Sequence, residues 1–131
     1  MLTTGSIASG TFETSFEPCP SEPGPLAVIG RQLVAKRFEG DLVGTSTVEM
    51  LSHLTVVEGS GGYVALEVVS GVLWGRRGGF VVAHLGLMDG GQQLLDLRIV
   101  PRSGTGELSD LAGTMRIDLV DGVHRYELTV A

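Results

Sequence analysis

Between Gly40 and Ala131 the chain alternates short, strongly apolar runs with glycine-rich breaks. Runs of this length between turn sequences predict strands joined by tight hairpins. Asp121-Gly122 is the clearest hairpin signal, because this dipeptide suits two positions of positive φ. We therefore expect a meander of antiparallel strands. The six runs cover residues 42–51, 63–74, 80–88, 94–100, 114–120 and 124–130.

The part of the chain before Gly40 is less regular. Gly10–Phe16 alternates apolar and polar residues and predicts a first strand, whereas residues 17–25 hold four of the five prolines and predict a loop. Ala27–Glu39 resumes an extended pattern, with a short helix over Arg31–Lys36 as the alternative. A meander of six to eight strands in so short a chain closes on itself. The predicted fold is all-β: a single antiparallel closed β-barrel of about eight strands with minimal helix.

Two strands do not alternate apolar and polar residues. Phe80–Met88 is apolar on both faces, and Leu94–Val100 is nearly so. A strand backed by solvent should show a polar residue at every second position, so the outer face of these strands is expected to be covered. Either the proline-rich loop or a second subunit covers it. We favour a homo-oligomer, because one short loop cannot shield two strands of this length.

Composition narrows the classes of function. The chain has 131 residues, and we expect residues 1–131 to form one domain. The net charge is −6 and the basic residues do not cluster beyond Arg76-Arg77, which argues against a nucleic-acid partner. No run approaches the roughly 20 apolar residues of a membrane-spanning helix, and Met1–Gly10 lacks the features of a signal peptide. Cys19 is the single cysteine, so we expect a cytoplasmic protein without a disulfide framework.

Three stretches, taken in order, carry a resemblance to a known family. They are Gly44–Leu51, Leu66–His84, and Ile99–Leu108 continuing to Leu111-Ala112-Gly113. With the rest of the chain from about Gly10 onward, this series resembles an uncharacterised family of small, mostly bacterial proteins with the allene oxide cyclase type of β-barrel. The resemblance implies an eight-stranded, oligomeric barrel, comparable in size to a lipocalin, with an interior pocket. It does not imply allene oxide cyclase activity, although related barrels include cyclases that fold a polyketide in an apolar cavity.

Two carboxylates are the first candidates for chemistry inside such a barrel. Glu67 lies in a run otherwise without charge, and Glu49 lies among apolar residues of the preceding strand. If these strands pair as a hairpin, both carboxylates can share one face. One pKa would then be raised, giving an acid beside an anion. The alternative is that each points outward, solvated or paired with an arginine such as Arg98 or Arg116.

His84 is the third candidate catalytic residue, because it lies in the most apolar strand on the same face as Phe80 and Val82. It could serve as a proton shuttle, or it could simply donate to a backbone carbonyl. The three histidines stand on different strands without metal-ligand spacing, so we predict neither a metal nor another cofactor. Ser103–Glu107 resembles a phosphate-binding loop but lacks its lysine, which favours a turn.

A set of apolar and aromatic residues completes the predicted site by lining a pocket in the lumen. Core packing explains the aromatic ones equally well. These candidate ligand-binding residues are Tyr63, Trp74, Phe80, Leu97 and Tyr126.

The predicted function is to bind a small hydrophobic molecule in the barrel lumen. One form of this hypothesis is a cofactor-independent isomerase or cyclase, in which Glu67 or Glu49 polarises the substrate. The alternatives are a barrel that binds without catalysis and a barrel with a packed core, whose role lies in its oligomer surface.

Overall fold

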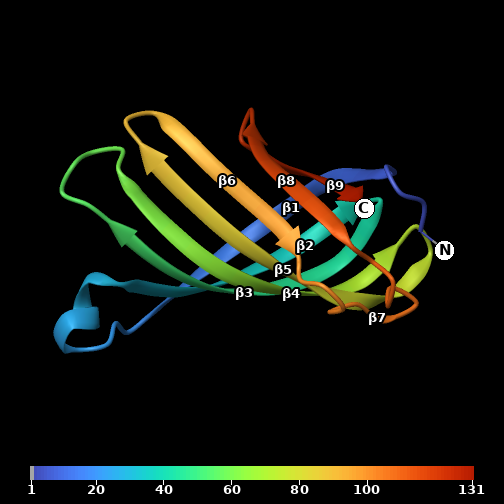
Figure 1. Ribbon diagram of the computed structural model, residues 1–131, viewed down its shortest axis with the longest axis horizontal. Helices are drawn as coiled ribbons and strands as arrows, with labels where there is room; N and C mark the ends of the chain where they lie inside the picture. Colours follow the sequence, from blue (N-terminus) through green and yellow to red (C-terminus); the bar gives the residue numbers. More distant parts are fainter. Residues whose placement is uncertain (1) are drawn as a thin grey trace.

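The computed structural model describes residues 2–131, so Met1, which belongs to the predicted domain, lies outside the described residues. Within them the chain forms a closed, antiparallel, eight-stranded β-barrel with one additional short strand (Figure 1). The strands of the barrel pair in the order β1-β2-β3-β4-β5-β6-β8-β9, and β9 pairs with β1 to close it. The predicted fold class is confirmed. The elements are β1 (Ile7–Cys19), η1 (Gly24–Val28), β2 (Gly30–Gly40), β3 (Leu42–Leu54), β4 (Gly61–Leu73), β5 (Arg76–Asp89), β6 (Gln92–Ile99), β7 (Thr105–Gly106), β8 (Gly113–Val120) and β9 (Val123–Val130).

The first two strands differ from the prediction in their extent. β1 continues through Glu17, Pro18 and Cys19, which were predicted to lie in the loop. The pairing of β1 with β9 covers Ile7–Phe12, so Pro18 stands in an edge segment, where a strand tolerates a residue without an N–H. The alternative of a helix over Arg31–Lys36 is wrong, because β2 pairs with both β1 and β3 along this segment.

The turns follow the glycine pattern of the sequence. Asp121 and Gly122 join β8 to β9 with positive φ at both positions, as predicted for this dipeptide. Trp74 and Gly75 join β4 to β5 in the same manner. The predicted turn over Ser103–Glu107 contains β7, which pairs with Gly78 and Gly79 of β5.

One end of the barrel, which we call the closed end, is filled by side chains. Its core includes Phe38, Leu73, Phe80 and Leu128, each at most 2% exposed. Tyr126 ties this core to the backbone: its hydroxyl donates to the Glu39 carbonyl oxygen at 3.0 Å and accepts from the Leu42 N–H at 2.9 Å. Gly10 makes room for this phenol, because a Cβ there would lie 2.6 Å from the hydroxyl oxygen.

The other end, which we call the open end, is less enclosed. The β6–β8 pairing covers Leu97 and Arg98, so residues 13–19 of β1 and 92–96 of β6 extend beyond the ring of paired strands (Figure 1). A separate small cluster of Val34, Val48 and Ala65 packs on the inner face here. The inner face therefore passes from a filled core to an accessible mouth along the same strands.

The outer face of β3, β4 and β5 remains apolar and exposed in the single chain. Val64, Leu66 and Val68 of β4 are 50–60% exposed, and Leu85 and Leu87 of β5 are 39% and 48% exposed. The segment with η1 lies over one border of this face rather than across it (Figure 1). No helix within residues 2–131 is long and apolar enough to span a membrane.

Candidate functional site

Four neighbouring strands each place one polar side chain on the inner face, and these side chains meet. They are Lys36 of β2, Ser46 of β3, Glu67 of β4 and His84 of β5, all at most 7% exposed. Glu67 is the centre of the group. Its Oε1 accepts from His84 Nε2 at 2.8 Å and from Lys36 Nζ at 3.2 Å, and its Oε2 accepts from the Ser46 hydroxyl at 2.5 Å. A buried carboxylate is costly unless paired, and this one is fully engaged.

These contacts decide the charge of Glu67. Burial by itself raises the pKa of the carboxyl group, but the hydrogen bond from His84, the charge of Lys36 and the hydrogen bond from Ser46 outweigh it. The net result is a pKa below the ordinary value, so Glu67 is an anion at neutral pH. An ionised carboxylate only accepts hydrogen bonds, and His84 must therefore carry a proton on Nε2.

Tyr63 extends this chain of hydrogen bonds toward the mouth. Its hydroxyl lies 3.3 Å from His84 Nδ1, which accepts the phenolic proton when the imidazole is neutral. Burial raises the pKa of the Tyr63 hydroxyl, and the charge of Glu67 raises it further, so the phenol stays protonated near neutral pH. Gly86 permits this placement, because a Cβ at Gly86 would lie 2.2 Å from the Tyr63 ring.

A cavity of about 230 Å³ opens beside Tyr63 at the open end. Its walls combine thioether, amide and hydroxyl groups with apolar side chains, and include Gln32, Met50, Ser52, Leu54, Tyr63, Met88 and Gln93. Several large apolar residues on inward-facing positions stay exposed around this end: Phe16 (58%), Leu54 (72%), Met88 (42%) and Leu119 (63%). The mouth thus offers apolar contact area next to one end of the hydrogen-bonded chain of Tyr63, His84 and Glu67.

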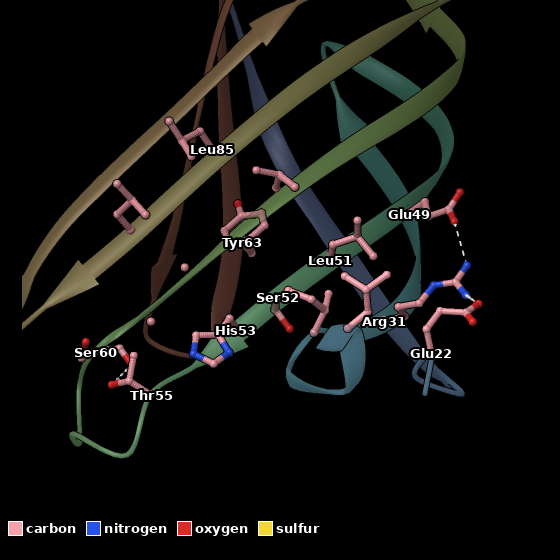
Figure 2. Close-up of a pocket in the computed structure, with 16 residues that line it drawn as sticks. Glu22, Arg31, Glu49, Leu51, Ser52, His53, Thr55, Ser60, Tyr63 and Leu85 are labelled. Atoms are coloured by element: carbon pink, nitrogen blue, oxygen red, sulfur yellow. Dashed lines mark hydrogen bonds and ion pairs between the residues drawn. The ribbon is translucent and has the colours of Figure 1, made fainter. Parts of the chain in front are cut away.

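A larger groove of about 880 Å³ lies on the outer face. Leu26 and Ile29 line it from the segment that contains η1, and Leu51, Val64 and Leu85 line it from β3, β4 and β5. Figure 2 shows Leu51 and Leu85 on their strands, with Arg31 and Glu22 beside them. At its rim Arg31 bridges Glu22 at 3.7 Å and Glu49 at 3.5 Å, while the His53 ring contacts the Val28 carbonyl oxygen at 2.8 Å. Ser52, Tyr63 and Leu87 line both the groove and the mouth. We place the candidate chemistry at the mouth, because the Tyr63 hydroxyl bonds to His84 on the inner face of the sheet.

The two predicted carboxylates do not meet. β3 and β4 pair as a hairpin, as expected, but Val48 stands opposite Glu67, so Glu49 belongs to the outer face. Its side chain is 65% exposed and pairs with Arg31. The outward alternative therefore holds for Glu49, although its partner is Arg31 and not Arg98 or Arg116. The expectation of a raised pKa is also wrong for Glu67, because its cationic and hydrogen-bonding partners lower it.

The other predicted site residues divide between mouth and core. Glu67 and His84 are in direct contact, and Tyr63 lines the mouth. Phe80, Leu97 and Tyr126 are at most 2% exposed and pack in the closed end, which makes them core residues. Trp74 lies in the β4–β5 turn, 39% exposed, at the end away from the mouth.

Sequence reasoning missed Lys36 and Ser46. The signal for Lys36 was its position between Val34 and Phe38, where the alternation of β2 calls for an inward residue. A lysine there needs an anionic partner, and Glu67 is that partner. Among residues 2–131, no three His, Cys, Asp or Glu side chains form a group that could hold a metal ion.

Comparisons with known proteins agree with this fold. A family model described as a protein of unknown function, DUF3224, matches residues 8–130. The chain is also similar to a crystal structure of a DUF3224 protein of unknown function from Shewanella oneidensis MR-1, with 42% identity and a TM-score of 0.91. The match covers 97% of this chain and 96% of that one. None of the curated proteins compared matches the chain. The predicted resemblance to an uncharacterised family is thereby confirmed, and its likeness to allene oxide cyclase stays a prediction.

Proposed function

The chain belongs to the DUF3224 family, whose description gives no function, and from the site we propose that it binds a small, largely apolar molecule at the open end. We further propose that Tyr63, His84 and Glu67 pass a proton to or from that molecule, as in a cofactor-independent isomerase or cyclase. The observation that carries the proposal is the continuous hydrogen-bonded chain from a buried carboxylate to a phenol at the mouth.

The proposed chemistry follows from the order of the three groups. With His84 doubly protonated, Nδ1–H donates to the Tyr63 oxygen and the phenolic proton is free to donate to an oxygen atom of the bound molecule. When the bound molecule loses a proton from the carbon next to its carbonyl group to water at the mouth, negative charge develops on the carbonyl oxygen. The Tyr63 proton then moves to that oxygen and the His84 proton moves to Tyr63, while His84 still donates to Glu67 through Nε2. When water returns a proton to a different carbon, the oxygen gives its proton back through Tyr63 to His84, which releases the isomer and restores the starting state.

A binding protein without catalysis, or a barrel with a structural role, is the second candidate. The observation that favours it is the filled closed end, together with the modest volume of the cavity at the mouth, about 230 Å³. Under this interpretation the buried polar group only stabilises the sheet.

The binding part is tested with the neutral fluorescent probe N-phenyl-1-naphthylamine and a pair of adjacent substitutions on opposite faces. Met50 lines the mouth and Leu51 lines the outer groove. We expect Met50→Trp to weaken probe binding by at least about tenfold, since it removes the open volume, and Leu51→Trp to leave binding unchanged. Loss of binding in Leu51→Trp alone would move the ligand site to the outer groove and contradict the proposal.

The catalytic part is tested with 3-cyclohexen-1-one, whose isomerisation to the conjugated ketone is followed by ultraviolet absorbance. Removing a general acid typically costs a factor of 10² to 10⁴, so we expect Tyr63→Phe and Glu67→Gln to lower the rate by about 100-fold. Glu49→Gln, on the outer face, serves as the control and should keep the full rate. An equal rate in all three variants would exclude the relay and leave binding as the function.

A further inference from the structure

The outer face of β3, β4 and β5 carries a contiguous apolar patch. Its members are Leu51, Val64, Leu66, Val68, Leu85 and Leu87, each 39–60% exposed and all on outward positions of hydrogen-bonded neighbouring strands. Single exposed apolar residues are ordinary on a protein surface, but a patch that spans three strands is typical of an interaction site.

Charged residues border this patch in a regular order. The strand register forms one row across the sheet that begins at Arg31 of β2, crosses Leu51, Val64 and Leu85, and ends at Asp96 of β6. The row therefore has a guanidinium at one border and a carboxylate at the other. The neighbouring row has the opposite order, with Glu49 on β3 and Arg98 on β6.

We propose that a second copy of this chain covers the patch, related to the first by a two-fold axis that runs along β4. Such an axis lays the β2 border of one copy over the β6 border of the other. Arg31 of each copy then faces Asp96 of the other, and Glu49 of each copy lies beside Arg98 of the other. An isologous interface must be self-complementary, and these two rows meet that condition in charge as well as in apolarity.

The outer groove fits the same occupant. It lies along the β2 side of the patch, with Leu26 and Ile29 as its wall. The axis carries the β5–β6 hairpin of the second copy onto this side. Leu94, which is 53% exposed on the outer face of that hairpin and stands opposite Leu87, would enter the groove. Leu87 belongs to both the patch and the mouth, but Arg31, Leu85 and Asp96, which carry the test below, do not line the mouth. Failure of the dimer is therefore distinguishable from failure of the proposed function.

The test is a charge exchange monitored by analytical ultracentrifugation of the full chain at micromolar concentration. We expect the wild type to be a dimer. Arg31→Asp and Asp96→Arg should each weaken dimerisation by at least about tenfold, because each places two like-charged pairs in the interface. The combination Arg31→Asp with Asp96→Arg should restore dimerisation, since it re-forms both pairs in the opposite sense. Leu85→Glu should also give monomers.

Arg37→Asp is the matched control. Arg37 pairs with Glu13 at 2.8 Å on the outer face of β1 and β2, away from the patch, and its reversal should leave the dimer unchanged. Circular dichroism of each variant separates loss of association from loss of fold. A monomeric wild type overturns the proposal. The proposal is also overturned if Arg31→Asp and Asp96→Arg each leave the dimer intact. It is overturned as well if the variant that combines them is folded but stays monomeric.

Discussion

The closed and open ends of the barrel are built from the same strands but are filled differently. At the closed end large apolar side chains such as Phe38, Phe80 and Leu128 pack against one another, and Tyr126 bonds to the backbone. At the open end the inner face carries a buried ion pair between Lys36 and Glu67, and beyond it a mouth. The closed end is thus filled by apolar side chains, whereas the open end combines a buried ion pair with an accessible cavity.

This difference indicates how stability and function are divided. Apolar burial stabilises the closed end through the area removed from water. A buried ion pair contributes little net stability, because the desolvation of both charges offsets their attraction. The cluster of four polar side chains in the lumen is therefore the feature on which the proposed chemical role rests. Substitutions at each end of the barrel test this division.

The largest effect is expected from truncating the core. Phe80→Ala should lower the free energy of unfolding by about 3–5 kcal/mol, because it leaves a cavity in a packed region. Phe16 is the matched control, since it faces inward at the open end but is 58% exposed, and Phe16→Ala should cost less than about 1 kcal/mol. Urea denaturation measures both. Equal losses would show that the open end is packed like the closed end.

Breaking the buried ion pair should have the next largest effect. Glu67→Gln leaves the ammonium of Lys36 buried without its counter-charge and should cost about 3 kcal/mol. Adding Lys36→Met should recover most of this loss, because the remaining group is then uncharged. Glu49→Gln, which removes an exposed pair with Arg31, should change the free energy of unfolding by less than about 1 kcal/mol. If Glu67→Gln combined with Lys36→Met lost as much free energy of unfolding as Glu67→Gln alone, the electrostatic explanation would be contradicted.

The carboxylate of Glu67 should also make the stability of the fold depend on pH. The pKa of Glu67 is lower in the folded state than in the unfolded chain, so the unfolded chain binds more protons at acid pH. Its stabilising contribution is complete above about pH 5 and is lost as the pH falls through the folded pKa. Thermal melts between neutral and acid pH should therefore show a steeper decline for the wild type than for Glu67→Gln. Parallel declines would assign the acid sensitivity to other carboxylates.

The two tyrosines give the smallest and most specific comparison. Tyr126→Phe should cost about 1–2 kcal/mol, because it leaves the Glu39 carbonyl and the Leu42 N–H without this partner. Tyr63→Phe should cost less, since its bond to His84 is long and its hydroxyl borders the mouth. Burial raises the pKa of both phenols. Each variant keeps one tyrosine, and spectrophotometric titration should show that the pKa of this remaining tyrosine lies above the ordinary value. An ordinary titration of Tyr63 would show that the mouth is more open to solvent.

Much of the fold could be predicted from local signals. Apolar runs and glycine breaks located the strands after Gly40, because period-two alternation and positive-φ turns are written in neighbouring residues. The length of β1 could not be predicted, since whether Pro18 is tolerated depends on where the pairing with β9 stops. That information lies more than a hundred residues away in the chain.

The candidate site was predictable only in part. A charge inside an apolar run identified Glu67, and the same argument misplaced Glu49, because a shift of one residue in register changes the face. Lys36 was not found, since its role depends on a partner two strands away. The lumen residues Phe80, Leu97 and Tyr126 faced inward as expected, but the volume left between them is a property of packing, which no single sequence reveals.

The most direct test of the central claim uses the three histidines as internal reporters. His53 lies at the outer groove, His84 in the buried polar group, and His124 stacks on Phe12 at a ring-centroid distance of 5.0 Å. In ¹⁵N-labelled protein titrated with N-phenyl-1-naphthylamine, we predict that the His84 Nδ1 resonance shifts and that its Nε2 stays protonated. The resonances of His53 and His124 should not move. A shift of His53 with His84 unchanged would place the ligand on the outer face and contradict the account.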